Sequence, residues 1–301
     1  MKIAIAGGTG FVGKALVTEL SKRNHEIIIL TRNLNRTIEK NVQYVQWLMP
    51  NTNPIDPLEN TDIFINLAGE SINSGRWTEQ RKYKIVNSRI HTVDEMLKLI
   101  KNLKHKPNLL INASAIGYYG TSEGQIFTEE DGAANNDFLS KTVFQWENKA
   151  TEAEQLGVRT VLCRFGVILD KNQGALPKMA FPYKLFAGGT VGSGRQWLSW
   201  IHIDDVIEGI LFIIDHEQIK GPVNFTVPNP VTMKEFGGVL GSVLHRPHWL
   251  PVPGFALKLL LGEMSMIVLE GQKVLPKKLI KTGFQFKYSH LELALKNIFP
   301  I

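Results

Sequence analysis

Cysteine is almost absent from this chain, since Cys163 is the single one among 301 residues. One thiol cannot form a disulfide within the chain, which fits a reducing compartment, and we expect a cytoplasmic protein. No cluster of Cys and His residues has the spacing of a zinc site, so we expect no bound metal. The composition therefore argues against disulfide-stabilised and zinc-dependent folds.

Long apolar runs are also missing. No run approaches the roughly 20 residues that cross a bilayer, and the amino terminus reaches the glycine pair Gly7 and Gly8 too soon for a signal peptide. Basic residues exceed acidic ones by 34 to 28, but the net charge of +6 is spread along the chain. We expect no membrane partner and no nucleic-acid partner, whereas a small ligand that carries phosphate suits this charge.

Short apolar runs alternate with amphipathic stretches over about the first 170 residues, which predicts strands and helices in turn. The predicted strands are residues 2–6, 26–30, 42–47, 63–67, 108–113 and 159–165. The predicted helices are a stretch from Phe11 to Leu20 and residues 92–103 and 144–156. Parallel strands need long crossovers, so the alternation predicts an α/β fold with a doubly wound parallel Rossmann sheet.

The pattern changes after residue 170. Glycines and prolines interrupt the periodicity over residues 171–199, and we predict a loop-rich insertion there that faces a cleft. A strand and a helix return at 200–214, a last strand follows at 223–227, and helices are predicted at 233–244, 255–261 and 291–298. We therefore predict a Rossmann domain over 1–227 and a smaller C-terminal cap domain over 228–301, in a monomer or a homodimer.

A glycine-rich turn joins the first predicted strand to the first helix, with Gly7, Gly10 and Gly13 around Thr9, Phe11 and Val12. Gly7 permits a tight turn, Gly10 lets a pyrophosphate approach the backbone, and Gly13 lets the helix pack on the strand. The free N–H groups at the helix N-terminus favour an anion. A glycine-rich turn without a ligand is the alternative, but position, spacing and the following helix all favour dinucleotide binding.

The second predicted strand ends in Thr31 and Arg32, where an NAD site would place Asp or Glu for the ribose hydroxyls. A guanidinium can pair with the 2′-phosphate of NADP, which an acid would repel. The sequence thus predicts NADP(H) as cofactor. A solvated surface arginine is the alternative for Arg32, and Arg36 and Lys40 are either a supplement to it or exposed loop charges.

Together with this turn, a set of short motifs resembles the extended short-chain dehydrogenase/reductases of the NAD-dependent epimerase/dehydratase type. More narrowly, the chain is similar to the atypical epimerase-like proteins that end in a small domain of unknown function. The motifs lie at residues 66–70, 75–77, 87–89, 117–120, 146–147, 192–194, 200–205 and 269–274. The resemblance implies that Leu67, Ala68 and Gly69 line the cofactor and that Arg89 reaches it. From the residues alone, Arg89 is equally a structural arginine on a helix face.

The chain departs from this family at the catalytic Tyr-x-x-x-Lys pair. Counting back from Glu147 places Leu139 in the Tyr position and Val143 in the Lys position, and neither side chain can exchange a proton. Ala115 occupies the position of the usual hydroxyl after the fifth strand, with Ser114 one residue early. Leu198 replaces the arginine of nucleotide-sugar epimerases, so a nucleotide-sugar substrate is poorly supported.

Substitute acids or bases are sought among Tyr118, Tyr119 and Glu70, which follow predicted strands at the edge where ligands bind in such sheets. Packing beneath the cofactor is the alternative role for Tyr119, and a backbone hydrogen bond is the alternative for Glu70. Ser193, Arg195 and His202 are candidates for the substrate cleft. Their alternatives are a plain loop for Ser193 and Arg195, and a buried polar network with Asp204 and Asp205 for His202.

Two functions follow from these observations. The first is an NADP(H)-binding oxidoreductase or epimerase of the epimerase family that acts on an unidentified small molecule. The second is a non-catalytic NADP(H)-binding sensor or regulatory protein. Loss of the Tyr and Lys pair favours the second function, whereas the polar residues retained around the cleft favour the first.

Overall fold

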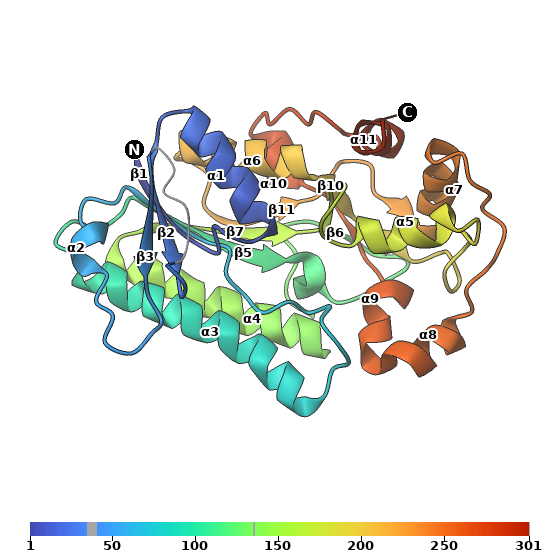
Figure 1. The fold of residues 1–301 in the computed structure, drawn as a ribbon, viewed down its shortest axis with the longest axis horizontal. Helices are drawn as coiled ribbons and strands as arrows, with labels where there is room; N and C mark the ends of the chain where they lie inside the picture. The colour runs from blue at the N-terminus through green and yellow to red at the C-terminus, as the bar shows by residue number, and fades with distance from the viewer. Residues whose placement is uncertain (35–40, 135, 301) are drawn as a thin grey trace.

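The computed structural model describes residues 1–34, 41–134 and 136–300. Seven parallel strands form the central sheet in the order β11-β7-β5-β4-β1-β2-β3, as Figure 1 shows. Their bounds are β1 Lys2–Ala6, β2 Glu26–Thr31, β3 Val42–Gln46, β4 Ile63–Asn66, β5 Leu109–Ala115, β7 Arg159–Phe165 and β11 Gly221–Phe225. The predicted α/β class and the parallel Rossmann sheet are confirmed, because the buried apolar runs read as strands and each crossover is long enough for a helix.

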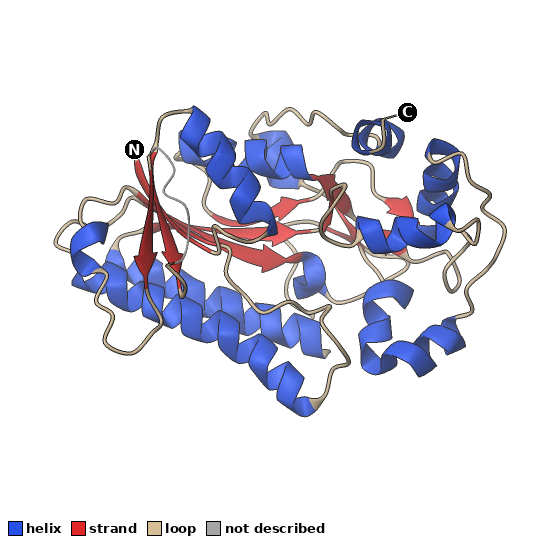
Figure 2. Cartoon of the chain, viewed as in Figure 1, coloured by secondary structure: helices blue, strands red, loops and turns tan. Residues whose placement is uncertain are grey.

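Helices cover both faces of the sheet (Figure 2). On one face α1 (Phe11–Lys22) and α6 (Ile203–Asp215) bury their apolar stripes against the strands, and on the other α3 (Glu79–Asn102) and α4 (Phe138–Thr151) do so. The two-residue alternation within each strand sends side chains to both of these cores. Within the described chain, no helix is both long and apolar enough to span a bilayer.

Two helices begin earlier than the periodicity predicts. The first four residues of α3, residues 79–82, are polar, so its buried stripe starts only at Ile85. The side chain of Asp137 accepts a hydrogen bond from the Ser140 backbone N–H, and this capping box starts α4 at Phe138 instead of residue 144. Local capping thus extends both helices beyond their apolar pattern.

The insertion at 171–199 is more ordered than predicted. It contains α5 (Leu176–Lys184), in which Pro177 lies in the first turn, where its missing N–H costs nothing. The insertion is flanked by β8 (Val167–Leu169), which pairs in parallel with β10 (Trp200–His202). The strand β9 (Trp197–Leu198) pairs with β12 (Val231–Thr232) in antiparallel fashion.

The C-terminal region packs on the sheet domain, and short strands of the two parts pair with each other. β13 (Lys273–Val274) pairs with β6 (Ile126–Phe127), and α7 (Met233–Val243) and α11 (Leu291–Ile298) share one apolar core with α6. The remaining elements are α2 Ile55–Leu58, α8 Gly254–Leu261, α9 Met266–Leu269, α10 Lys277–Lys281 and the 3-10 helices Ile116–Tyr119, Glu152–Leu156 and Gly262–Ser265. The boundary at residue 227 stays a prediction.

Candidate functional site

The turn after β1 is shaped by close backbone contacts. Gly7 has a φ of +79°, and a Cβ at this position would lie 2.7 Å from the backbone carbon of Leu67. A Cβ on Gly13 would lie 2.1 Å from the carbonyl oxygen of Gly7. Both glycines are required because the turn, the first helix and the loop after β4 approach one another too closely for any side chain.

Gly10 differs from its two neighbours in the motif. It is the N-cap of α1 with a φ of −82°, and among the described residues a Cβ here would meet only the Gly7 carbonyl oxygen, 3.2 Å away. No side chain caps this helix and its first turn holds no acidic residue. The backbone N–H groups of Phe11 and Val12 therefore lie at a helix N-terminus that favours an anion, and Thr9 directly precedes this end.

β2 is parallel to β1 and in register with it, so its end at Thr31 lies at the same edge of the sheet. The Thr31 hydroxyl hydrogen-bonds Asn33. The side chain of Arg32 is exposed and forms no ion pair with any residue that the structure describes. Arg36 and Lys40 lie outside the described residues. Arg32 thus stands where the sequence predicts a cation, with no counter-ion among the described residues.

The loop after β4 is held by polar groups beneath it. Asn66, fully buried, accepts a hydrogen bond from the Ala68 N–H and donates one of 2.7 Å to Asn112. Arg89 donates from Nη1 to the carbonyl oxygens of Glu70 and Ile85, and its guanidinium lies 5.1 Å from the Trp146 ring. Burial lowers the pKa of Arg89 to about 10. The predicted residues Leu67, Ala68, Gly69 and Arg89 therefore do come together, with Arg89 supporting the loop.

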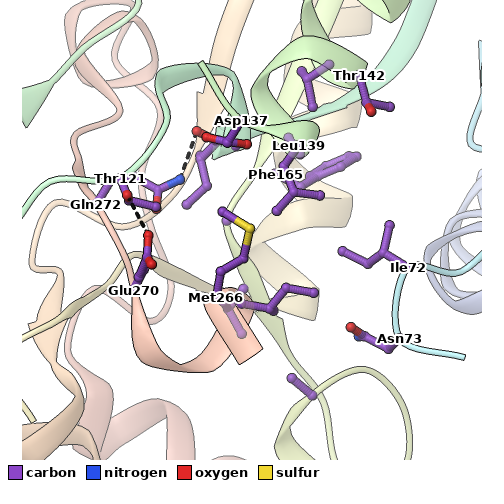
Figure 3. Close-up of a pocket in the computed structure, with 18 of the residues that line it drawn as sticks. Ile72, Asn73, Thr121, Asp137, Leu139, Thr142, Phe165, Met266, Glu270 and Gln272 are labelled. Carbon is purple, nitrogen blue, oxygen red and sulfur yellow. Dashed lines mark hydrogen bonds between the residues drawn. The ribbon is translucent and has the colours of Figure 1, made fainter. Parts of the chain in front are cut away.

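A cavity of about 370 Å³ opens at the carboxyl ends of β5 and β7. Met266 and Glu270 of the C-terminal region line one side of it, and Ile72 and Asn73 line another (Figure 3). Apolar groups dominate the wall. Its polar side chains are Asn73, Arg89, Thr121, Asp137, Thr142, Glu270 and Gln272.

The two positions of the missing catalytic pair face this cavity. Leu139 and Val143 both line it, one turn apart on α4. Ala115 also lines the cavity, whereas the Ser114 hydroxyl donates a hydrogen bond of 2.5 Å to Glu147. The alignment of these positions from the sequence therefore fits the geometry, and an apolar surface occupies the place of the Tyr and Lys.

Tyr119 lies in a buried network and is not among the cavity-lining residues. Its hydroxyl accepts a hydrogen bond of 2.7 Å from Arg164 and donates one of 2.7 Å to Asn224. Burial raises the pKa of Tyr119 to about 12. The Tyr118 ring stacks on the same guanidinium at 3.5 Å and is also absent from the wall. The geometry thus favours the packing role for Tyr119.

Glu70 points to another partner. Its carboxylate pairs with Arg81 of α3 at 2.9 Å, and its backbone N–H donates to the Ser88 hydroxyl. The side chain is 43% exposed and does not line the cavity. Among the described residues the Glu70 carboxylate thus binds Arg81 instead of the backbone, in an ion pair that the sequence does not reveal.

The three predicted cleft residues do not line the cavity either. Ser193 donates to Gln196, and Arg195 is exposed and pairs with Glu123 at 3.5 Å. His202 is buried as the N-cap of α6, where its Nδ1 accepts the Asp204 N–H, and its ring packs on Tyr288. Their assignment to a substrate cleft stays a prediction, since Ser193 and Arg195 lie in the loop before β9 and His202 is the last residue of β10.

The cavity contains residues that sequence reasoning missed. Asp137 combines helix capping with a place in the wall, and Thr121 donates a hydrogen bond of 2.9 Å to Glu270. Gln272 donates from Nε2 to the carbonyl oxygen of Ile116. The motif at 269–274 was the only sequence signal for Glu270 and Gln272. Periodicity does not indicate which strand end these two residues reach.

Residues 3–227 match the NAD dependent epimerase/dehydratase family, and residues 252–298 match a domain of unknown function, DUF1731. The chain belongs to the NAD dependent epimerase/dehydratase family. Among curated relatives of this epimerase family, "Epimerase family protein YfhF" of Bacillus subtilis is 50% identical over 99% of this chain and 98% of its own length. "Epimerase family protein SAR0825" of Staphylococcus aureus is 45% identical over 98% of this chain and 97% of its own.

Solved structures of the epimerase family agree with the fold. The human epimerase family protein SDR39U1, crystallised with NADPH, superposes with a TM-score of 0.86, is 30% identical and covers 99% of both chains. A protein of Corynebacterium glutamicum described as a nucleoside-diphosphate sugar epimerase has a TM-score of 0.77 and 28% identity. It covers 98% of this chain, which spans 57% of that longer protein.

Proposed function

We propose that this epimerase-family protein binds NADP(H) at the carboxyl edge of its sheet and uses it to oxidise or reduce a small molecule in the cavity. The observation that carries the proposal is the uncapped N-terminus of α1 beside Gly10, at the same sheet edge as Arg32, which has no ion pair with a described residue. The human relative crystallised with NADPH supports the choice of cofactor.

The residues present fit a dinucleotide. Space at Gly10, which any larger side chain would fill, admits a pyrophosphate to the α1 N–H groups. Arg32 is free to pair with a 2′-phosphate, and no described acid follows β2 to repel it. The loop at Leu67 and Ala68 lies against Gly7 and so borders the glycine-rich turn.

When bound, NADP(H) supplies or accepts a hydride. The chain contributes a wall of apolar side chains, including Leu139, Val143 and Phe165, which excludes water from the cavity. The carboxyl groups in the wall are Asp137 and Glu270. Asp137 uses Oδ1 to cap α4, and the described residues give its Oδ2 no hydrogen bond, so Oδ2 is the place where the chain would hold a proton.

One set of measurements tests this proposal. Isothermal titration calorimetry with NADPH and NADH should give the tighter binding for NADPH. An assay that follows NADPH absorbance with a panel of small carbonyl compounds should then show turnover, which D137N reduces while NADPH affinity stays unchanged. Absence of NADPH binding would overturn the cofactor assignment.

A second function, a non-catalytic NADP(H) sensor or regulatory protein, is favoured by one observation. Leu139 and Val143 leave no acid and no orienting cation at the positions where relatives with the Tyr and Lys pair do their chemistry. Tight NADPH binding without turnover of any compound in the panel would support the sensor and contradict the enzyme.

A further inference from the structure

Exposed large apolar residues lie on α5, on α8 and on the segment that leads into α8. These elements lie at one end of the molecule (Figure 1). We call this surface the apolar face. It consists of Phe181, Leu185, Phe186, Trp249, Leu250, Phe255, Leu259 and Leu260, each 47% or more exposed.

The helix α8 has no buried residue, although all of its residues except Lys258 are apolar or glycine. Phe255 and Leu259 are 75% and 80% exposed and lie one turn apart on the same side of the helix. Arg76 of the β4–α3 loop binds the carbonyl oxygens of Leu259 and Leu260. Arg76 therefore holds the backbone of the helix, while Phe255, Leu259 and Leu260 stay mostly exposed.

Hydrogen bonds and a cation–π contact connect the aromatic residues of the face. The Trp249 N–H donates to the Gly188 carbonyl oxygen, and the Trp249 indole N–H donates to that of Phe186. The Arg246 guanidinium lies 4.4 Å from the Phe186 ring. Because the protein itself satisfies the indole N–H, the Trp249 ring, 67% exposed, offers its apolar surface outward.

The charge next to the apolar face is mainly positive, and Glu263, the first acid after α8, is paired with Lys82. Residues 171–203 and 236–262 contain no Asp or Glu. The cations within these stretches that border the face are Lys178, Lys184, Arg246 and Lys258. Soluble proteins normally expose large apolar side chains singly, whereas eight of them lie on the elements at this end of the molecule. A second copy of the chain docking through the same face would bring cations against cations.

We propose that the apolar face seats the protein on the surface of a bilayer that contains anionic phospholipid. Trp, Phe and Leu side chains would enter the boundary between headgroups and acyl chains, and the Lys and Arg side chains would contact lipid phosphate. The lack of a spanning helix excludes only insertion across the bilayer, so this peripheral contact departs from the expectation of no membrane partner. The proposal is independent of cofactor binding.

Vesicle co-sedimentation tests the proposal with the full chain. Vesicles of phosphatidylcholine mixed with phosphatidylglycerol should bind the protein, and vesicles of phosphatidylcholine alone should bind it at least tenfold more weakly. F255S/L259S should lower the partition coefficient at least tenfold, because two apolar side chains no longer enter the interface. K184E/K258E should lower it at least tenfold as well, since each cation near an anionic surface contributes about fivefold.

Matched controls separate this face from exposed apolar residues elsewhere. Tyr83 on α3 is 67% exposed and Leu293 on α11 is 57% exposed, and Y83S and L293S should bind vesicles like the unmodified protein. Thermal melts check that all variants fold. Equal vesicle binding by F255S/L259S and Y83S would overturn the proposal. So would no binding to either vesicle, or a dimer in sedimentation equilibrium that F255S/L259S dissociates.

Discussion

Arg164 and Glu147 form a buried ion pair through two hydrogen bonds, 2.8 Å from Nε to Oε1 and 2.7 Å from Nη2 to Oε2. The side chains are 3% and 5% exposed. The pair joins α4 to β7 and also binds Ser114 and Tyr119, whose chain neighbours Ala115 and Gly120 line the cavity. Glu147 thus holds β5 and β7 together next to the cavity, through its hydrogen bonds to Ser114 and Arg164.

We expect E147Q to destabilise the protein strongly. The amide keeps the shape of the carboxylate but leaves the Arg164 guanidinium buried without a counter-charge, which costs about 3–5 kcal/mol. Thermal and urea unfolding measure the change. E292Q removes an exposed pair with Lys296 and should unfold close to the unmodified protein. Equal losses in both variants would contradict the structural role of the pair.

R32A should weaken NADPH binding about ten- to a hundredfold and leave NADH nearly unchanged. A charged hydrogen bond to phosphate is worth about 1.5–3 kcal/mol, and NADH lacks the phosphate. Titration calorimetry with both cofactors makes the comparison. Equal affinity of the unmodified protein for NADPH and NADH would refute the assignment.

G10V should abolish cofactor binding with little effect on folding. The φ of Gly10 suits any residue, and the space around its Cβ position is open apart from the Gly7 carbonyl, so the valine side chain occupies room that the pyrophosphate needs. Quenching of Trp fluorescence by NADPH measures binding. G13V serves as the contrast, because its Cβ meets backbone and should unfold the protein. Unchanged quenching in G10V would rule out the phosphate turn.

Sugar nucleotides should turn over slowly or not at all. Leu139 and Val143 supply no positioned acid or base, a loss that typically costs a factor of about 100 to 10,000. Rapid turnover of a UDP-sugar would contradict this argument. Y118F and Y119F, assayed with any small carbonyl that proves active, test whether either phenol donates the proton. Since neither lines the cavity, we expect both variants to retain activity.

Stability should fall as the pH drops below about 6.5, the usual pKa of histidine. Burial lowers the pKa of His202, and the Asp204 carboxylate offsets this only in part. Between the lowered folded pKa and the unfolded value the unfolded chain binds more protons, so the stabilisation is complete above this window and lost below it. Protonation at Nδ1 would also remove the cap of α6.

H202N tests this pH dependence. An asparagine oxygen can cap the helix without titrating, so urea unfolding of the variant should depend less steeply on pH across the same window. An unchanged slope would show that other groups carry the loss.

The sequence alone determined the features that depend on local pattern. Apolar runs of strand length and the glycines at 7, 10 and 13 predict the sheet and the turn, because periodicity and backbone freedom act over a few residues. The family resemblance, not local pattern, placed Leu139 and Val143 at the Tyr and Lys positions, and both side chains line the cavity.

Only the tertiary structure decided which side chains meet at the site. Thr121 and Glu270 are 149 residues apart and hydrogen-bonded, and Tyr119 turns from the cavity to Arg164 and Asn224. The sequence placed Tyr119 at the right strand end but could not give its direction. The direction of the Tyr119 side chain depends on Arg164 of β7 and Asn224 of β11, because a buried hydroxyl takes the position in which its hydrogen bonds are satisfied.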